Sequence, residues 1–398
     1  MGFRACAVEG LGLSVNRGAD RGAIDPEFWR GRRVFLTGHT GFKGSWLSLW
    51  LQSMGAELTG FALPPATSPS LFLLAGVAQG MHSVMGDVRS LDAVRSALAQ
   101  ARPEVVIHMA AQALVRESYS TPVETFATNV MGTVNLLEAV RHTPGVRSVV
   151  VVTTDKCYQN REWVWPYRED EAMGGHDPYS ASKGCAELAT AAWRASFFGL
   201  SRSDSSRAAA PGVASARAGN VIGGGDWSTD RLVPDILAAF AAGRPVSIRN
   251  PHATRPWQHV MEPVGAYLLL AERLFHDPQA HAQAWNFGPE PRDVRPVRAI
   301  VDAMAALWGD GASSAIDAGE HPHEASLLAL DISKARHALG WQPRLALDAA
   351  LRLTVDWARA HARGEDLHAL TLAQIAGYLQ LPGMALPGMA LPVMDAAS

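Results

Sequence analysis

Thr37-Gly38-His39-Thr40-Gly41-Phe42-Lys43-Gly44 decides the fold of this chain. An apolar run precedes it at 34–36, and apolar residues at helical spacing follow it at 45–51, which predicts a strand, a glycine turn and a helix in succession. Glycine lets the backbone approach phosphate closely, and a helix N-terminus offers free N–H groups to an anion. The stretch therefore predicts a site for a dinucleotide pyrophosphate, with contacts expected from Gly38, Thr40, Gly41, Phe42, Lys43 and Gly44.

The composition is typical of a soluble globular protein. The 398 residues suffice for a large core and two lobes, with 48% apolar and 18% charged residues. A formal net charge of -3 argues against general affinity for nucleic acid or an anionic membrane. With no apolar run near the ~20 residues of a membrane span and no secretory pattern at the start, we expect a cytoplasmic protein. Cys6, Cys157 and Cys185 form neither a disulfide framework nor a metal-ligand spacing.

Strands and helices alternate as far as residue 160. This pattern predicts an α/β fold, a doubly wound parallel sheet of the Rossmann type with a smaller C-terminal lobe. We expect strands at 57–63, 81–89, 105–112, 148–156 and 213–218. We expect a loosely ordered extension at 1–25 and a low-complexity tail at 381–398. Between them, residues 26–215 are expected to form mainly the dinucleotide-binding domain. Residues 216–380 are expected to form mainly the substrate lobe, with some segments that return to the dinucleotide-binding domain.

The regular alternation is lost beyond the last of these strands. The sequence predicts a surface loop at 201–208 and further loops at 220–227, 231–235, 249–251 and 254–259, with helices at 261–274 and 343–358. The core is expected to begin at Phe28. These loops are assigned to the substrate lobe.

Several residues near the predicted strand ends are candidates for the cofactor site. Asp87 is placed to accept a hydrogen bond from the adenine amino group, although a cap on the helix that follows is an equal alternative. Other expected contacts are Val88, the small or polar residues Ala110, Ala111 and Gln112, Asn129 on a helix from about Pro122, and Thr153. No acidic residue ends the second strand, so that position does not distinguish NAD from NADP.

A tyrosine and a lysine at helical spacing form the candidate catalytic pair. Pro178 opens a predicted helix, and Tyr179 and Lys183 share one face of it. An ammonium near a phenol stabilises the phenolate, so we expect Lys183 to lower the pKa of Tyr179 from its ordinary value of about 10. Two ordinary surface residues are the alternative, but the glycine turn and the polar strand end at 153–155 favour an active site.

Six motifs together resemble one known family. They are TGHTGFKGSWL at 37–47, HMAAQALVRESY at 108–119, TTDKCYQNREW at 153–163, DPYSASK at 177–183, RAGNVIGGGDW at 217–227 and TRPWQHV at 254–260. From about Phe28 to about Leu381 the chain resembles the extended short-chain dehydrogenase/reductases, and within them the CDP-glucose branch of the sugar-nucleotide 4,6-dehydratases. Lys156 directly after Asp155 is typical of that branch, since a glutamate follows the aspartate in related dTDP-glucose enzymes.

The resemblance implies a lyase that oxidises, dehydrates and reduces one bound sugar. Tyr179 would remove the 4-hydroxyl proton, Thr154 would hydrogen-bond the same oxygen, and Lys183 would also hold the cofactor ribose. Asp155 would protonate the departing 6-hydroxyl, while Lys156 would act as the base at C5 or would stabilise the enolate if another base acts. Because the cofactor ends as it began, NAD is expected rather than NADP.

The expected substrate is CDP-glucose. Arg231, Arg249 and Arg255 are candidates to neutralise its diphosphate, because guanidinium groups match phosphate oxygens, and by the resemblance Asn220 would contact the sugar diphosphate. The resemblance also implies a homodimer or a dimer of dimers, built on helices near 122–142 and 178–198. The alternatives are a dehydratase or epimerase for another nucleotide sugar, and a cofactor-sensing protein without turnover.

Overall fold

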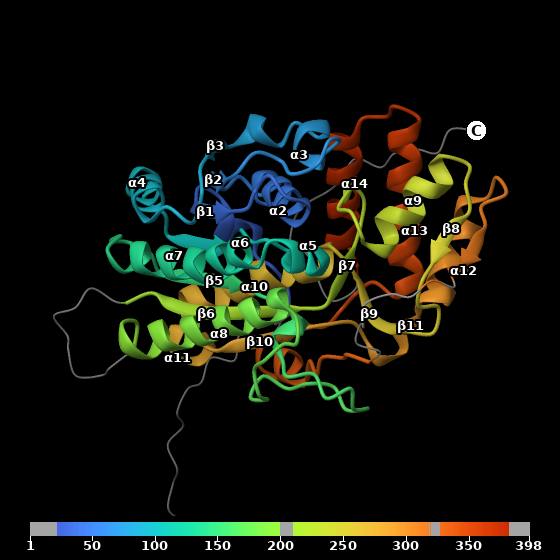
Figure 1. Ribbon diagram of the computed structural model, residues 1–398. Coiled ribbons are helices and arrows are strands. Elements are labelled where there is room, and N and C mark those ends of the chain that lie inside the picture. The colour runs from blue at the N-terminus through green and yellow to red at the C-terminus, as the bar shows by residue number, and fades with distance from the viewer. Residues whose placement is uncertain (1–21, 200–209, 318, 320–326, 382–398) are drawn as a thin grey trace, which may run out of the picture.

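A large parallel sheet organises the molecule (Figure 1). The structure is a computed structural model that describes residues 22–199, 210–317, 319 and 327–381. Within these residues seven parallel strands pair in the order β10-β6-β5-β4-β1-β2-β3. They are β1 (Arg33–Thr37), β2 (Glu57–Ala62), β3 (His82–Met85), β4 (Val105–His108), β5 (Ser148–Val152), β6 (Gly212–Ala218) and β10 (Ala284–Phe287). The strand order reverses between β1 and β4, and ligands bind at such a switch point in doubly wound sheets.

Helices cover both faces of this sheet. Along β5 every residue is buried, with Val149 and Val151 packed into one apolar cluster and Val150 and Val152 into the other. One face packs on α2 (Phe42–Ser53) and α10 (Met261–His276), and the other on α4 (Leu91–Ala101), α7 (Gly132–Arg141) and α8 (Pro178–Ser196). Burial of each such valine contributes about 1.5–3 kcal/mol. The predicted fold class is confirmed.

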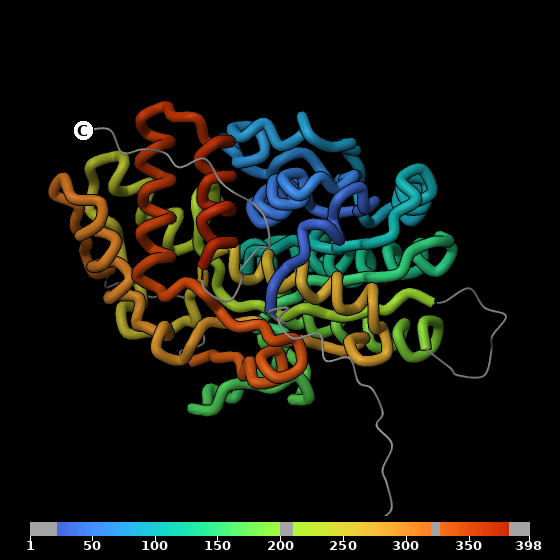
Figure 2. Tube along the Cα trace, turned by 180° about the vertical axis from the view of Figure 1, so that it is seen from behind, coloured from blue at the N-terminus to red at the C-terminus, as the bar shows by residue number. Residues whose placement is uncertain are grey.

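A smaller lobe with its own apolar core lies beside the main sheet (Figure 1). It contains α9 (Leu232–Ala241), α12 (Val297–Trp308) and α13 (Leu347–Ala362), the sheet of β7 (Asn220–Ile222), β9 (Thr254–His259) and β11 (Val294–Pro296), and the pair β8 (Val246–Ile248) and β12 (Ser314–Ile316). Between these segments the chain returns to the main sheet at α10 and β10. Figure 2 shows α13 next to α14 (Leu367–Leu379), which packs on α2.

Shorter helical segments complete the described chain. They are α1 (Pro26–Trp29), α3 (Leu71–Leu74), α5 (Val115–Ser120), α6 (Pro122–Phe126) and α11 (Pro278–His281), 3-10 turns at Val77–Gly80, Asp155–Cys157 and Pro291–Asp293, and π turns at Ala127–Met131 and Ala335–Leu339. The helix expected from Pro122 to Val140 is therefore α6 and α7 joined through a π turn. No helix in the described ranges has both the length and the apolar character needed to cross a membrane.

The prediction of loops in the substrate lobe is wrong at three places. Residues 254–259 form strand β9, residues 220–222 form β7, and α9 begins at Leu232. The sequence did not predict β9, because it contains Pro256 and the polar residues Gln258 and His259. Proline is rare in strands, and polar residues rarely fill a core. Here Gln258 is buried with its amide donating to the Phe287 carbonyl at 3.1 Å.

The packed chain begins earlier than expected. Ile24 is 2% exposed, and the Asp25 backbone N–H donates to Glu272 of α10 at 3.1 Å, so the core starts before Phe28. The expected helices at 261–274 and 343–358 are confirmed with shifted ends, as α10 and α13. The loop predicted at 201–208, the extension up to residue 21 and the tail beyond Leu381 lie outside the described residues.

Gly224 lies in close contact with both parts of the molecule, so a side chain at this position should destabilise the folded protein. Its carbonyl accepts a hydrogen bond from the Trp46 indole of α2 at 2.9 Å, and an added Cβ would lie 2.0 Å from Trp357 Cγ of α13. We expect Gly224→Ala to lower the free energy of unfolding by about 1–3 kcal/mol, measured by urea denaturation. The control is Gly377→Ala in α14, where the added Cβ meets none of the described atoms within 4 Å. It should raise stability by about 0.5–1 kcal/mol. Equal effects would contradict the packing argument.

Candidate active site

The glycine turn between β1 and α2 forms an open cradle. Gly38 has a φ angle of +80°, and an added Cβ would lie 2.8 Å from the Ala110 nitrogen. A Cβ on Gly44 would lie 2.0 Å from the Gly38 carbonyl oxygen. Gly41 caps α2 without a side-chain hydrogen bond, so within the described residues the first N–H groups of the helix have no capping side chain. The backbone can therefore approach an anion here as the sequence predicted.

Buried polar side chains hold this turn in place. Thr37 accepts hydrogen bonds from the backbone N–H groups of Met109 and Ala110, each at 3.1 Å, and its hydroxyl lies 2.7 Å from His108 Nδ1. Thr40 donates to the Leu63 carbonyl at 2.8 Å. Burial lowers the pKa of His108 to about 3, so His108 is neutral and acts as a hydrogen-bonding core residue.

The predicted catalytic residues meet where β5 ends beside α8. Tyr179 is buried and forms a hydrogen bond with Thr154, and the Lys183 ammonium donates to the Val152 carbonyl at 3.4 Å. The expected lowering of the Tyr179 pKa is wrong, because burial raises it to about 12 and outweighs the hydrogen bond with Thr154, which lowers it. Burial also lowers the pKa of Lys183 to about 8. Sequence spacing places the pair on one helix face, but it cannot report how deeply the pair is buried.

Asp155 and Lys156 form an ion pair next to Tyr179. Lys156 Nζ lies 3.3 Å from Asp155 Oδ1 and 3.1 Å from Asn220 Oδ1. Asp155 is fully buried, and its other carboxylate oxygen has no hydrogen-bond partner within the described part of the chain. Thr154 donates to Asp155 Oδ1 at 2.9 Å. The arrangement therefore places an acid, an amine and a phenol together at one strand end.

Lys43 brings the glycine turn into the same cluster. Its ammonium lies 6.0 Å from the centre of the Tyr267 ring. Burial, together with the positive charges of Arg231 and Lys183, lowers the pKa of Lys43 to about 7. The charge of Arg231 also lowers the pKa of Tyr179. The site thus gathers cations from α2, α8 and the start of α9.

The loop after β4 is fixed to α8 through Asn129. The Gln112 N–H donates to Asn129 Oδ1 at 2.9 Å, and Asn129 Nδ2 donates to the Gln112 carbonyl at 3.0 Å and to Ser182 Oγ at 2.9 Å. Asn129 lies in the π turn of 127–131, a distortion that is frequent at functional sites. Ala110 and Ala111 are half-buried in this loop.

Asp87 and Val88 lie beyond the end of β3. Asp87 pairs with Arg89 at 2.6 Å, while the cap of α4 is Ser90, so the alternative that Asp87 caps this helix is wrong. Val88 is buried against Gly132, where an added Cβ would lie 2.7 Å from the valine Cγ2.

Comparison with known proteins assigns the family. Residues 34–288 match the NAD dependent epimerase/dehydratase family. The chain belongs to this family. It is 53% identical over 356 residues to the CDP-glucose 4,6-dehydratase of Salmonella typhimurium, across 89% of this chain and 98% of that relative.

Solved structures of this family share the fold. The UDP-glucose 4-epimerase of Thermus thermophilus in complex with NAD is 26% identical, with a TM-score of 0.68 over 82% of this chain and 99% of that one. The dTDP-glucose 4,6-dehydratase of Bacillus anthracis in complex with NAD is 20% identical, with a TM-score of 0.67 over 84% of this chain and 98% of that one. The second likeness concerns the fold alone.

The residues present fit the NAD of this family. The cradle at Gly38 and Gly44 admits no side chain, and the N-terminus of α2 behind it favours phosphate. The half-buried Ala110 and Ala111 lie beside it without bulky side chains. Both features are those that a dinucleotide needs at a strand-turn-helix site.

The predicted diphosphate arginines have different surroundings. Arg231 pairs with Asp226 at 3.0 Å, and Arg249 pairs with Asp230 at 3.5 Å and with Asp235 at 3.8 Å. Arg255, on β9, donates to the Thr254 carbonyl at 2.9 Å. Arg231 is linked to the catalytic cluster, because its positive charge lowers the pKa values of Lys43 and Tyr179.

Two buried charged residues near the site were missed by the sequence analysis. Glu187, one helical turn after Lys183, pairs with Arg217 of β6 at 2.9 Å. The Arg217 guanidinium also donates to the Tyr158 hydroxyl at 2.7 Å and to the Glu169 carbonyl at 2.9 Å. Glu187 continues the spacing of Tyr179 and Lys183, and that repeat was the available signal.

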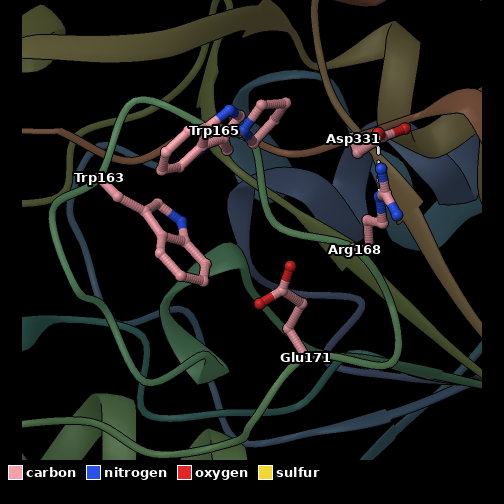
Figure 3. Close-up of a pocket in the computed structure, with 6 residues that line it drawn as sticks. Trp163, Trp165, Arg168, Glu171 and Asp331 are labelled. Carbon is pink, nitrogen blue, oxygen red and sulfur yellow. Dashed lines mark ion pairs between the residues drawn. The ribbon is translucent and has the colours of Figure 1, made fainter.

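The segment after Lys156 also forms a hollow of about 220 Å³ (Figure 3). Figure 3 shows Trp163 and Trp165 on one side and the ion pair of Arg168 with Asp331, at 3.8 Å, on the other. Glu171 points into the space between them. The hydrogen bonds of Arg217 hold this segment onto the main sheet.

Lys43 should cost stability in a pH-dependent way. Its folded pKa of about 7 lies below the unfolded value near 10, so from about pH 7 to pH 10 the unfolded chain binds the extra proton and stability rises with pH. We expect Lys43→Met to raise the melting temperature more at pH 6 than at pH 9, as measured by differential scanning fluorimetry against the wild-type protein. An equal change at both pH values would show that the charge of half-buried Lys43 does not destabilise the folded protein.

Proposed function

We propose that this protein is a CDP-glucose 4,6-dehydratase, a hydro-lyase that converts CDP-D-glucose to CDP-4-dehydro-6-deoxy-D-glucose and water. The observation that carries the proposal is the cluster of Thr154, Asp155, Lys156, Tyr179 and Lys183 at the end of β5 and the start of α8. The similarity to the Salmonella enzyme spans nearly all of that relative and supports the choice of substrate.

The cofactor residues follow from the cradle. We assign NAD to the glycine turn and to the neighbouring strand ends, with contacts from Gly38, Thr40, Gly41, Phe42, Lys43, Gly44, Asp87, Val88, Ala110, Ala111, Gln112, Asn129, Thr153, Tyr179 and Lys183. When bound, NAD would supply the redox chemistry of the reaction, which is the uptake and return of one hydride. The chain itself moves the protons and holds the sugar.

Tyr179 takes the proton of the 4-hydroxyl in its phenolate form, and Thr154 orients that hydroxyl. Burial disfavours the phenolate and raises the pKa of Tyr179, while the hydrogen bond with Thr154 and the charge of Arg231 lower that pKa. The ammonium of Lys183 lies one helical turn away on the same face of α8 and adds a positive charge at this side of the site. The 4-ketone formed at this stage acidifies the proton at C5.

The Asp155–Lys156 ion pair fits the elimination. Transfer of one proton from the ammonium to the carboxylate, across 3.3 Å, yields a neutral amine and a carboxylic acid. The amine of Lys156 then takes the C5 proton, and Asp155 protonates the departing 6-hydroxyl, so loss of water restores the ion pair. Asn220 holds the Lys156 ammonium at 3.1 Å during this cycle. The proton balance of the water loss is thereby met within one pair of residues. C5 regains a proton from the Lys156 ammonium as the hydride is returned at C6, and the proton that Tyr179 took from the 4-hydroxyl makes up for it.

The sugar diphosphate is assigned to the small lobe. We place it beside Arg231, with Arg249 and Arg255 as further cationic residues and Asn220 at the sugar end. Arg231 is the best placed of the three, because its charge acts on Tyr179 and Lys43.

We also propose a homodimer, or a dimer of such dimers, that works in the cytoplasm and supplies deoxysugar for a surface polysaccharide. α6 and α8 pack together and expose apolar side chains, including Val123 at 81% and Leu188 at 60% exposure. Such a surface is typical of a subunit interface. Light scattering of the purified protein measures the assembly directly.

The substrate assignment predicts a selective reaction. Purified protein with NAD should convert CDP-glucose to a product lighter by one water, and mass spectrometry of the product mixture detects that loss. UDP-, GDP- and dTDP-glucose serve as parallel samples. Faster turnover of one of these would favour a dehydratase for another nucleotide sugar, epimer formation without water loss would favour an epimerase, and NAD binding without any product would favour the cofactor-sensing alternative.

Removal of the Tyr179 hydroxyl should stop the first proton transfer. We expect Tyr179→Phe to lower kcat by about 10²–10⁴-fold, with NAD binding by calorimetry nearly unchanged. Tyr119→Phe is the matched control. It removes the same hydroxyl group from a tyrosine that is exposed and lies on α5. Turnover by Tyr179→Phe at the rate of the control would rule out the role given to Tyr179.

A further inference from the structure

Three consecutive residues at the end of β5 are each bound by one face of α8. The Val152 carbonyl accepts from Lys183 at 3.4 Å, the Thr153 hydroxyl donates to Glu187 at 2.5 Å, and Thr154 bonds to Tyr179. The three helix residues are spaced four apart, so they lie along one stripe of α8. The helix therefore sets where residues 152–154 lie.

Glu187 is the most connected of the three helix residues. It is 4% exposed, accepts hydrogen bonds from Thr153 at 2.5 Å and from Ser215 at 2.6 Å, and pairs with Arg217 at 2.9 Å. Burial alone would raise the pKa of Glu187, but Arg217 and the two hydroxyl donors together lower it below its ordinary value. A permanent negative charge is thus buried one turn from Lys183.

We propose that Glu187 is a positioning residue for the dehydration, which fixes the strand end that carries Thr154 and keeps the neighbouring Lys183 in its charged form. The inference rests on the proposed function, because it concerns the same site. Glu187 does not contact the reacting atoms in this account. It acts through Thr153 on one side and through the electric field at Lys183 on the other.

Among the charges around Lys183, that of Glu187 is the main one that stabilises the ammonium form of Lys183. Burial lowers the pKa of Lys183 to about 8, and Glu187 and Cys157 are the groups that raise it. On the other elements, Lys43 on α2 and His108 at the end of β4 both interact with the charge of Lys183. His108 is neutral at neutral pH. Cys157 raises the Lys183 pKa only as a thiolate, and burial raises the pKa of this thiol, so at neutral pH the supporting charge comes from Glu187. Loss of the Glu187 charge should therefore lower the Lys183 pKa.

The small number of lysines allows a direct measurement. The sequence contains four, Lys43, Lys156, Lys183 and Lys334, so ¹³C labelling of the lysine Cε gives few NMR signals, which single Lys→Arg variants assign. In the full-length protein without substrate, we expect the Lys183 signal to titrate near pH 8 and to move lower by about one pH unit in Glu187→Gln. The Lys334 midpoint should stay in place, because neither Glu187 nor Lys183 is among the charges that act on it.

Turnover gives the second measurement. With CDP-glucose and saturating NAD, the alkaline limb of kcat should move to lower pH by a similar amount in Glu187→Gln, a loss of about tenfold near pH 9, while KM stays the same. Glu187→Asp keeps the negative charge, so the alkaline limb of its kcat profile should stay at the wild-type pH. A merely structural role would reduce kcat equally at all pH values.

Controls separate charge from folding. Glu272→Gln replaces another buried carboxyl, one that burial already keeps largely neutral with a pKa of about 8, and it should leave the Lys183 midpoint unchanged. If Glu187→Gln leaves Arg217 unpaired and does not fold, Glu187→Gln with Arg217→Gln removes both charges and serves instead. An unchanged Lys183 midpoint in the folded variant would overturn the inference. Lack of turnover by the wild-type protein would refute the proposed function, while the NMR titration would still test Glu187.

Discussion

The hydrogen bonds between the end of β5 and one face of α8 constrain everything else in the site. A strand end is free to fray, whereas a helix of nineteen residues packed on a sheet is rigid. Because Thr153 and Thr154 are tied to Glu187 and Tyr179, the next two residues, Asp155 and Lys156, leave the sheet in a fixed direction. The 3-10 turn at 155–157 then presents the carboxylate and the amine together. Positions held by such rigid elements are the ones that catalysis requires.

The second constraint is the number of charges buried in a small volume. Isolated buried charges are costly, and here they occur in two ion pairs. Glu187 pairs with Arg217, and Asp155 pairs with Lys156. Both Glu187 oxygens accept a hydrogen bond from a hydroxyl, whereas one Asp155 oxygen and Arg217 Nε have no hydrogen-bond partner within the described chain. The Glu187 carboxylate is therefore fully used in holding the strands, while the unpaired Asp155 oxygen lies in the catalytic cluster and is available for proton transfer.

Local patterns in the sequence were sufficient for most of the fold. The glycine turn, the β-branched run of β5 and the Tyr179–Lys183 spacing depend on neighbours within a few residues, and each appears where it was expected. Strand β9 was missed because its burial comes from segments far along the chain, through Ile222 and Val294. The pKa of Tyr179 was misjudged for the same kind of reason, since it follows from burial that spacing does not encode.

The cations near Tyr179 link ligand binding to protonation. Burial lowers the pKa of Lys43 to about 7 and that of Lys183 to about 8, and the charge of Lys183 contributes to the lowering for Lys43. A diphosphate brings negative charge to this region and favours the charged forms of both lysines. Its binding energy is therefore spent partly on charging Lys43. In this way an anionic ligand offsets the cost of placing the Lys43 ammonium in the glycine turn.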